Sequence, residues 1–106
     1  MDYAVPILRV LPHIRAAVPE MTVFVDTGFQ RGTDVLKALA LGADAACVLT
    51  VLMVAYIGYG RQGVRDMLWV LVDELQRNMS LCGCRSIKDI DSSILWLPYP
   101  DRRREE

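Results

Sequence analysis

Residues 22–49 read TVFVDTGFQRGTDVLKALALGADAACVL and alternate between two kinds of local pattern. The β-branched and aromatic run at 22–25 predicts a short buried strand, which ends in the turn-forming residues 26–28. A helix is predicted over 33–41, and a second apolar strand over 45–49. A strand, a helix and a second strand in this order are typical of a parallel βαβ unit.

Helices are predicted on both sides of this unit. Residues 4–18 read as a helix entry and a helix, with Pro12 at a first helical position, where its missing N–H has no partner to lose. After a glycine-containing loop at 58–60, the longest helix is predicted over 63–79, and one more helical turn over 86–91. The order is therefore α-β-α-β-α, an α/β fold. Since two parallel strands need cover on both faces and neighbours at their edges, we expect this unit to be part of something larger.

The composition is that of one small domain with a hydrophobic core. The chain has 106 residues, of which 53% are hydrophobic, and a formal net charge of −1. This charge gives no general attraction to nucleic acid or to an acidic membrane surface. The longest apolar run, 47–57, is shorter than the roughly 20 residues of a membrane span and is interpreted as a buried strand that continues into a buried turn. The apolar side of the helix at 63–79 is assigned to the core.

The cysteines and the chain ends predict a cytoplasmic protein. The three cysteines, Cys47, Cys82 and Cys84, are odd in number, and the first residues have neither the basic start nor the apolar stretch of a secretion signal. Both features favour a reducing compartment. The last residues, 104–106, are not a peroxisomal address.

Three sequence anchors carry a resemblance to a known family. Residues 25–43 resemble the pattern D-G-G-hydrophobic-R-x-G-x-D-V-x-K-A-L-A-L-G-A of the FMN-dependent 2-hydroxy-acid oxidases and dehydrogenases, a family that includes glycolate oxidase and lactate oxidase. The G-C-R-S at 83–86, preceded by D-E-L at 73–75, is similar to a second family pattern. The third anchor is D-Y at 2–3, which resembles the family's L-D-Y. The resemblance covers about residues 1–94.

The resemblance implies a partial TIM (β/α)₈ barrel. The chain would supply helix 6 through helix 8 with two parallel strands, strand 7 and strand 8. Residues 1–94 would form the C-terminal part of the barrel and residues 95–106 a flexible tail. In such barrels the loops after strands 7 and 8 often hold a phosphate group. Here residues 26–28 follow strand 7, and residues 49–50 end strand 8.

The family's D-G-G-x-R loop and a later G-R pair hold the phosphate of FMN. By this resemblance the cofactor-binding residues are Asp26, Thr27, Gly28, Phe29, Gln30 and Thr50. The match is partial, because Thr27 replaces a glycine, Gln30 replaces the phosphate-facing arginine, and Leu49-Thr50 replaces Gly-Arg; the adjacent Arg31 is a partial substitute. Charge-assisted contacts contribute roughly 1.5–3 kcal/mol each, so two missing cations would weaken binding by on the order of 10²–10⁴.

The family's catalytic histidine and substrate-binding arginine lie in an H-G-x-R-Q segment immediately before L-D-Y. The chain begins with Met1 where that leucine would stand, so no catalytic residue is assigned and the chain alone is expected to be inactive. The family reaction converts a 2-hydroxy acid to a 2-oxo acid. The alternative is a non-enzymatic interaction module or a barrel-completing partner, which exposed strand edges would drive to self-associate or to bind a barrel-completing chain.

Simpler roles are expected for most of the other polar residues. His13, beside Pro12, is predicted to be solvent-facing or at a helix end. Cys82 and Cys84, one residue apart with no nearby histidine, make a poor zinc site, so no metal is expected. Asp34, or the preceding Thr33, would cap a helix. For Asp26, a turn-forming role and a functional role remain open.

Overall fold

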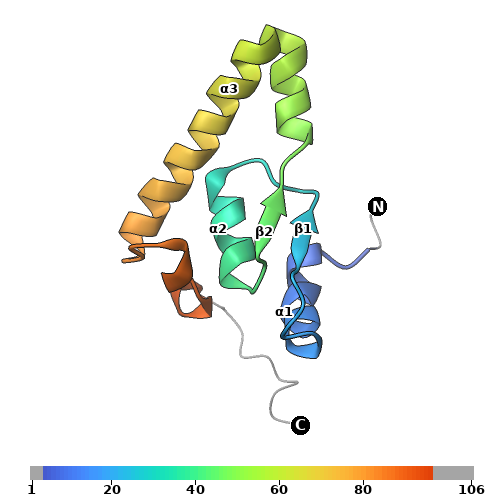
Figure 1. Cartoon of the computed structure of the whole chain (residues 1–106), viewed down its shortest axis with the longest axis vertical. Coiled ribbons are helices and arrows are strands. Elements are labelled where there is room, and N and C mark those ends of the chain that lie inside the picture. Colours follow the sequence, from blue (N-terminus) through green and yellow to red (C-terminus); the bar gives the residue numbers. More distant parts are fainter. Residues whose placement is uncertain (1–3, 97–106) are drawn as a thin grey trace.

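Three helices and two short strands alternate along the computed structural model, which describes residues 4–96 (Figure 1). The elements are α1 (Ile7–Ala17), β1 (Phe24–Asp26), α2 (Gly32–Ala40), β2 (Ala45–Cys47) and α3 (Thr50–Leu81), followed by the 3₁₀ helices η1 (Ile87–Asp89) and η2 (Ser92–Ile94). The predicted order α-β-α-β-α is confirmed. Residues 97–106 of the predicted tail, and the D-Y at 2–3, lie outside the described residues.

The two strands pair in parallel, as the βαβ pattern predicted. The register joins Val25 to Ala46 and Asp26 to Cys47. Because parallel strands leave a sheet at the same edge, the loops that follow Asp26 and Cys47 begin side by side. Helix α2 makes the crossover between the strands and lies between the sheet and the long part of α3 (Figure 1).

Apolar packing is divided between two clusters that share α2. The first joins α1, β1, α2 and their loops through Leu11, Val25, Phe29, Ala38 and Ala43. The second joins α2, α3 and the segment after α3 through Leu36, Ala40, Met79, Cys84 and Ile90. Successive apolar positions of α2 therefore enter different clusters, and α2 connects the sheet to α3.

The interpretation of the apolar run at 47–57 as a strand and a buried turn is wrong. Helix α3 already begins at Thr50, and side chains within the run such as Val54 and Ile57 are exposed. A short apolar run has no period that separates a strand from a helix. The predicted loop at 58–60 is confirmed in part, since Tyr59 and Gly60 have non-helical φ/ψ values and kink α3.

The first helix begins earlier than predicted. Pro6 stands at its N-cap, and Pro12 lies inside the helix instead of at its first position. Pro12 has no N–H to donate to the carbonyl of Leu8, so the helix continues with one hydrogen bond missing. His13 is exposed in the middle of α1, which agrees with a solvent-facing residue but not with a helix start.

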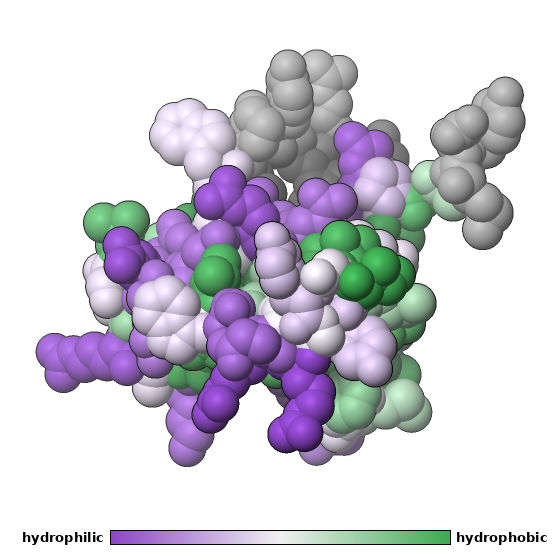
Figure 2. Space-filling model, turned by 90° about the horizontal axis from the view of Figure 1, so that it is seen from above, coloured by the Kyte–Doolittle hydropathy of each residue, from purple (hydrophilic) through white to green (hydrophobic). Residues whose placement is uncertain are grey.

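The apolar side of α3 is only partly buried. Leu71 and Met79 are buried, as expected for core residues, whereas Leu68 and Val72 are 44% and 52% exposed. Figure 2 shows hydrophobic residues open to solvent beside hydrophilic ones on the face seen from above. The assignment of this side to the core therefore holds for the residues that contact α2 and is wrong for the others. Within residues 4–96, no helix has both the length and the apolar content to cross a membrane.

Candidate functional site

The candidate site lies where the two strands end. Residues 27–31 connect β1 to α2, and residues 48–49 connect β2 to α3, at the end of the sheet toward which both arrows point in Figure 1. The structure therefore brings both predicted phosphate loops to one end of the sheet. The candidate residues at this end are Asp26, Thr27, Gly28, Phe29, Gln30 and Thr50. All except Phe29 are exposed.

The first loop turns through two residues with positive φ. Thr27 has a φ of 83° and Gly28 a φ of 82°. Gly28 adopts this conformation without steric cost, whereas the β-branched Thr27 is strained in it. Asp26 Oδ1 accepts a hydrogen bond of 2.8 Å from the Thr27 amide. This contact supports the turn-forming role of Asp26 and leaves its role toward a cofactor a prediction.

The amides that lead into α2 are bonded to carboxylates of the chain itself. Asp34 Oδ2 accepts from the amides of Gln30 and Arg31 at 3.1 Å each. Glu74, on α3, accepts from the Gly32 amide at 3.2 Å through Oε2. The capping role predicted for Asp34 is confirmed, with the helix starting one residue before Thr33. Three successive amides at the start of α2 are thus already bonded to carboxylates and are not free to bind a phosphate.

Donors for an anion remain elsewhere at this end of the sheet. In the described part of the chain, the amides of Gly28 and Phe29 have no backbone or side-chain acceptor. The Phe29 side chain is buried in the first cluster, so only its backbone can serve a ligand. The first turn of α3, which begins at Thr50, carries no acidic residue. These amides and the dipole of α3 suit a phosphate.

The cation nearest to the loop is already paired. Arg31 Nε lies 3.2 Å from Glu74 Oε2, while the Arg31 side chain is 70% exposed. Gln30 brings no charge. In this conformation the Arg31 side chain is engaged by Glu74, so an anion at this end of the sheet would depend on backbone and hydroxyl donors.

Within the described residues, the cysteines and the histidine do not form a polar cluster at this end of the sheet. Cys47 and Cys82 are exposed, whereas Cys84 is buried with its Sγ 3.8 Å from the Asp89 carbonyl oxygen. Burial, with a smaller contribution from Cys82, raises the pKa of the Cys84 thiol and makes it a weak nucleophile. Among residues 4–96, no group of three His, Cys, Asp or Glu side chains is arranged to hold a metal ion.

At the opposite end of the sheet, an ion pair connects α1 to the residue before β2. Asp44 Oδ2 accepts from the Val23 amide at 2.8 Å and from Arg15 Nη1 at 3.0 Å. The amide hydrogen bond, and then Arg15, hold the pKa of Asp44 below its ordinary value. Arg15 also donates to the carbonyls of Val18 and Gly42. Polar contacts at the amino ends of the strands are typical of stability rather than catalysis.

Comparison with known proteins establishes the family. Residues 1–97 match the family described as FMN-dependent dehydrogenase. The chain belongs to the FMN-dependent dehydrogenase family, and FMN is the cofactor of that family. The resemblance drawn from the sequence anchors is confirmed.

Among curated relatives, the chain is 40% identical over 97 residues to a 2-hydroxyacid oxidase of Dictyostelium discoideum, covering 91% of this chain and 25% of the relative. It is 43% identical to human 2-hydroxyacid oxidase 1 (83% and 24% covered) and 41% identical to an L-lactate oxidase of a Roseobacter species (85% and 24% covered). The chain spans about a quarter of the length of these relatives. A similar rice protein is described as peroxisomal, so the cytoplasmic location stays a prediction.

Solved structures give the same family. The fold superposes on (S)-mandelate dehydrogenase with a TM-score of 0.86 at 31% identity, covering 91% of this chain and 27% of that one. It superposes on a mandelate oxidase variant with an FMN adduct with a TM-score of 0.80 at 43% identity, covering 85% and 28%. The sequence did not predict the contact of Glu74 with Arg31 and Gly32, although Glu74 lies in the D-E-L motif at 73–75.

Proposed function

We propose that this chain forms the wedge of a (β/α)₈ barrel that holds the phosphate end of FMN in a 2-hydroxy-acid oxidase or dehydrogenase. The wedge would be helix 6 (α1), strand 7 (β1), helix 7 (α2), strand 8 (β2) and helix 8 (the part of α3 after its kink). The observation that carries this proposal is the end of the parallel pair, where the amides of Gly28 and Phe29 have no acceptor among the described residues and the first turn of α3 carries no acidic residue.

In this proposal the amides of Gly28 and Phe29, the Thr50 hydroxyl and the N-terminal dipole of α3 bind the phosphate. The positive φ of Gly28 supports this, because consecutive left-handed residues turn successive N–H groups out of the sheet. Bound FMN would supply the hydride acceptor for the conversion of a 2-hydroxy acid to a 2-oxo acid. The residues of this chain would bind and orient it.

We further propose that the 106-residue chain binds FMN weakly and has no turnover alone. The cationic positions of the family loop are Gln30 and Thr50 here, and Arg31 is paired with Glu74. No H-G-x-R-Q segment occurs in the sequence, and the single histidine, His13, lies exposed on α1. A proton-abstracting base for the substrate is therefore missing from the 106 residues.

Parallel titrations of the purified chain with FMN and with riboflavin, followed by flavin fluorescence, test the phosphate site. We expect FMN to bind more tightly than riboflavin, because the two ligands differ only in the phosphate. Equal affinities for FMN and riboflavin would contradict the proposed phosphate site. Added lactate or glycolate should leave the flavin spectrum unchanged, and bleaching of the flavin would contradict the proposed inactivity.

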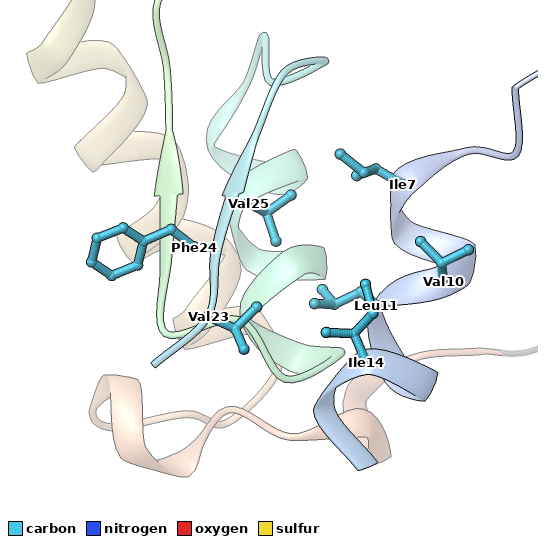
Figure 3. A pocket seen from close by; sticks show the side chains of 7 residues that line it. All are labelled: Ile7, Val10, Leu11, Ile14, Val23, Phe24 and Val25. Carbon is cyan, nitrogen blue, oxygen red and sulfur yellow. The ribbon is translucent and has the colours of Figure 1, made fainter. Parts of the chain in front are cut away.

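A specific surface supports the second candidate, an interaction module or barrel-completing partner. An apolar groove of about 110 Å³ runs between α1 and β1, and Figure 3 shows Ile7, Leu11 and Ile14 of α1 pointing toward Val23 and Val25. In the described residues, β1 pairs only with β2, so its other edge is open beside this groove. We propose that a second copy or a barrel-completing chain covers this edge, since open edges and exposed apolar patches favour association.

A further inference from the structure

Glu74 connects α3 to the first loop across a long stretch of sequence. A single carboxylate oxygen, Oε2, lies 3.2 Å from both the Arg31 Nε and the Gly32 backbone nitrogen. The Glu74 side chain is 23% exposed and that of Arg31 is 70% exposed. The more buried partner is thus on α3, and the contact joins the first loop to that helix.

The backbone of Gly32 makes this contact possible. A Cβ atom at Gly32 would lie 2.6 Å from the Leu71 carbonyl oxygen and from the Leu75 nitrogen, so α2 starts in direct contact with the backbone of α3. Asp34 meanwhile accepts from the amide of Arg31. Arg31 is therefore held by its backbone and by its side chain.

We propose that Glu74 is a positioning residue for the FMN phosphate. Its carboxylate occupies the N-terminus of α2 and pairs with Arg31, which leaves Gly28, Phe29 and the start of α3 as the place where the phosphate binds. This inference rests on the proposed function. A carboxylate at a helix N-terminus is stabilising there and excludes a second anion from the same amides.

The experiment compares Glu74→Ala and Glu74→Gln with Asp73→Asn as the matched control. Asp73 is the neighbouring carboxylate on α3 and pairs with Arg77 at 2.8 Å, without contact to the loop. Two readouts are needed in the same samples: hydrogen exchange of the Gly32 amide by NMR, and the affinity for FMN and for riboflavin. Glu74→Gln keeps an acceptor for the Gly32 amide and removes only the charge, so it also serves if Glu74→Ala fails to fold.

We expect Glu74→Ala to accelerate exchange of the Gly32 amide by about tenfold or more and to strengthen FMN binding by about tenfold, because the Gly32 amide and Arg31 become free to bind the phosphate, with riboflavin affinity unchanged. Glu74→Gln should recover most of the exchange protection, and Asp73→Asn should match the wild type. Unchanged FMN affinity in both Glu74 variants would overturn the inference while the proposed function stands. Absence of FMN binding by the wild type would overturn both.

Discussion

At the scale of single residues, Thr27 adopts a backbone conformation that favours glycine. Its φ is 83°. An L-residue in the left-handed region costs roughly 1–2 kcal/mol, and a β-branched residue is disfavoured there most. The loop geometry is therefore held by its surroundings, including the bond from the Thr27 amide to Asp26.

Thr27→Gly should stabilise the fold. Relief of the strain exceeds the entropy that a glycine adds to the unfolded chain, so we expect a gain of roughly 0.5–1 kcal/mol in the free energy of unfolding. Urea denaturation checks this value, with Thr27→Ala as the control that keeps the positive-φ cost of a side chain. A Thr27→Gly chain less stable than the wild type would show that Thr27 is not strained.

Gln30→Arg should strengthen FMN binding. It restores the cation of the family pattern, and one charge-assisted contact corresponds to about a tenfold to hundredfold gain in affinity. Riboflavin affinity should not change. Gln76→Arg adds the same charge at an exposed position of α3 and is the control. Equal gains from the two variants would indicate general electrostatic attraction instead of a phosphate contact.

Asp44 should make stability depend on pH in the acid range. The amide of Val23 and the guanidinium of Arg15 lower its pKa in the folded chain, so its contribution is present above the unfolded value of about 3.9 and is lost as the pH falls through the folded value. The Tm of the wild type should exceed that of Asp44→Asn above about pH 5, and the difference should shrink below about pH 4. A difference that grows on acidification would contradict this ion pair.

At the scale of elements, the contact of α2 with α3 fixes the site. Gly32→Ala should destabilise the chain by about 2 kcal/mol or more, because the added Cβ meets backbone atoms of Leu71 and Leu75 at 2.6 Å, and these atoms cannot move without shifting a helix. Thermal unfolding followed by circular dichroism measures the loss. Gly58→Ala, where nothing lies within 4 Å of the added Cβ, is the control. Equal stability of the two variants would mean that α2 and α3 are not in close contact.

Sequence patterns predicted the helices and strands better than the residues at which they begin and end. The βαβ unit and the break near Gly60 followed from turn residues and periodicity, which are local signals. The start of α3 at Thr50 did not follow from these signals, because the apolar run after β2 has no distinct period and few polar positions. Both strands are also shorter than predicted: β1 spans Phe24–Asp26 instead of 22–25, and β2 ends at Cys47 instead of Leu49.

The candidate site was predictable in its place but not in its contacts. The family pattern located the loop at Asp26 to Gln30, and the parallel order brought it to the same end of the sheet as Thr50. The pairing of Arg31 with Glu74 joins residues that are 43 positions apart. No local pattern encodes such a contact, because it depends on how α3 returns along α2 after its kink.

At the scale of the whole molecule, large apolar side chains are exposed on β1 and α3. Phe24, Trp69 and Ile57 are 66%, 67% and 80% exposed, although apolar side chains of this size are usually buried. Phe24 lies on β1, and the other two lie on the two parts of α3. Such a surface supports the proposal that this chain completes a larger assembly.

Ile14→Glu should reduce self-association. Ile14 lines the groove beside β1 and is 46% exposed, so a charge there opposes burial of the groove without disturbing the core. We expect light scattering to show species larger than the 11.9 kDa monomer for the wild type and a shift toward monomer for the variant. Tyr59→Glu at the exposed kink is the control. A wild-type chain that stays monomeric at high concentration would contradict an association surface.

The most direct test of the proposed phosphate site is an NMR titration of the isotope-labelled chain with FMN. We expect the largest shifts in amide resonances at Gly28, Phe29 and Thr50, and little change at the Gly32 amide, which is already bonded to Glu74. Shifts centred on Arg15 and Asp44 at the opposite end of the sheet, or no shifts at all, would contradict it.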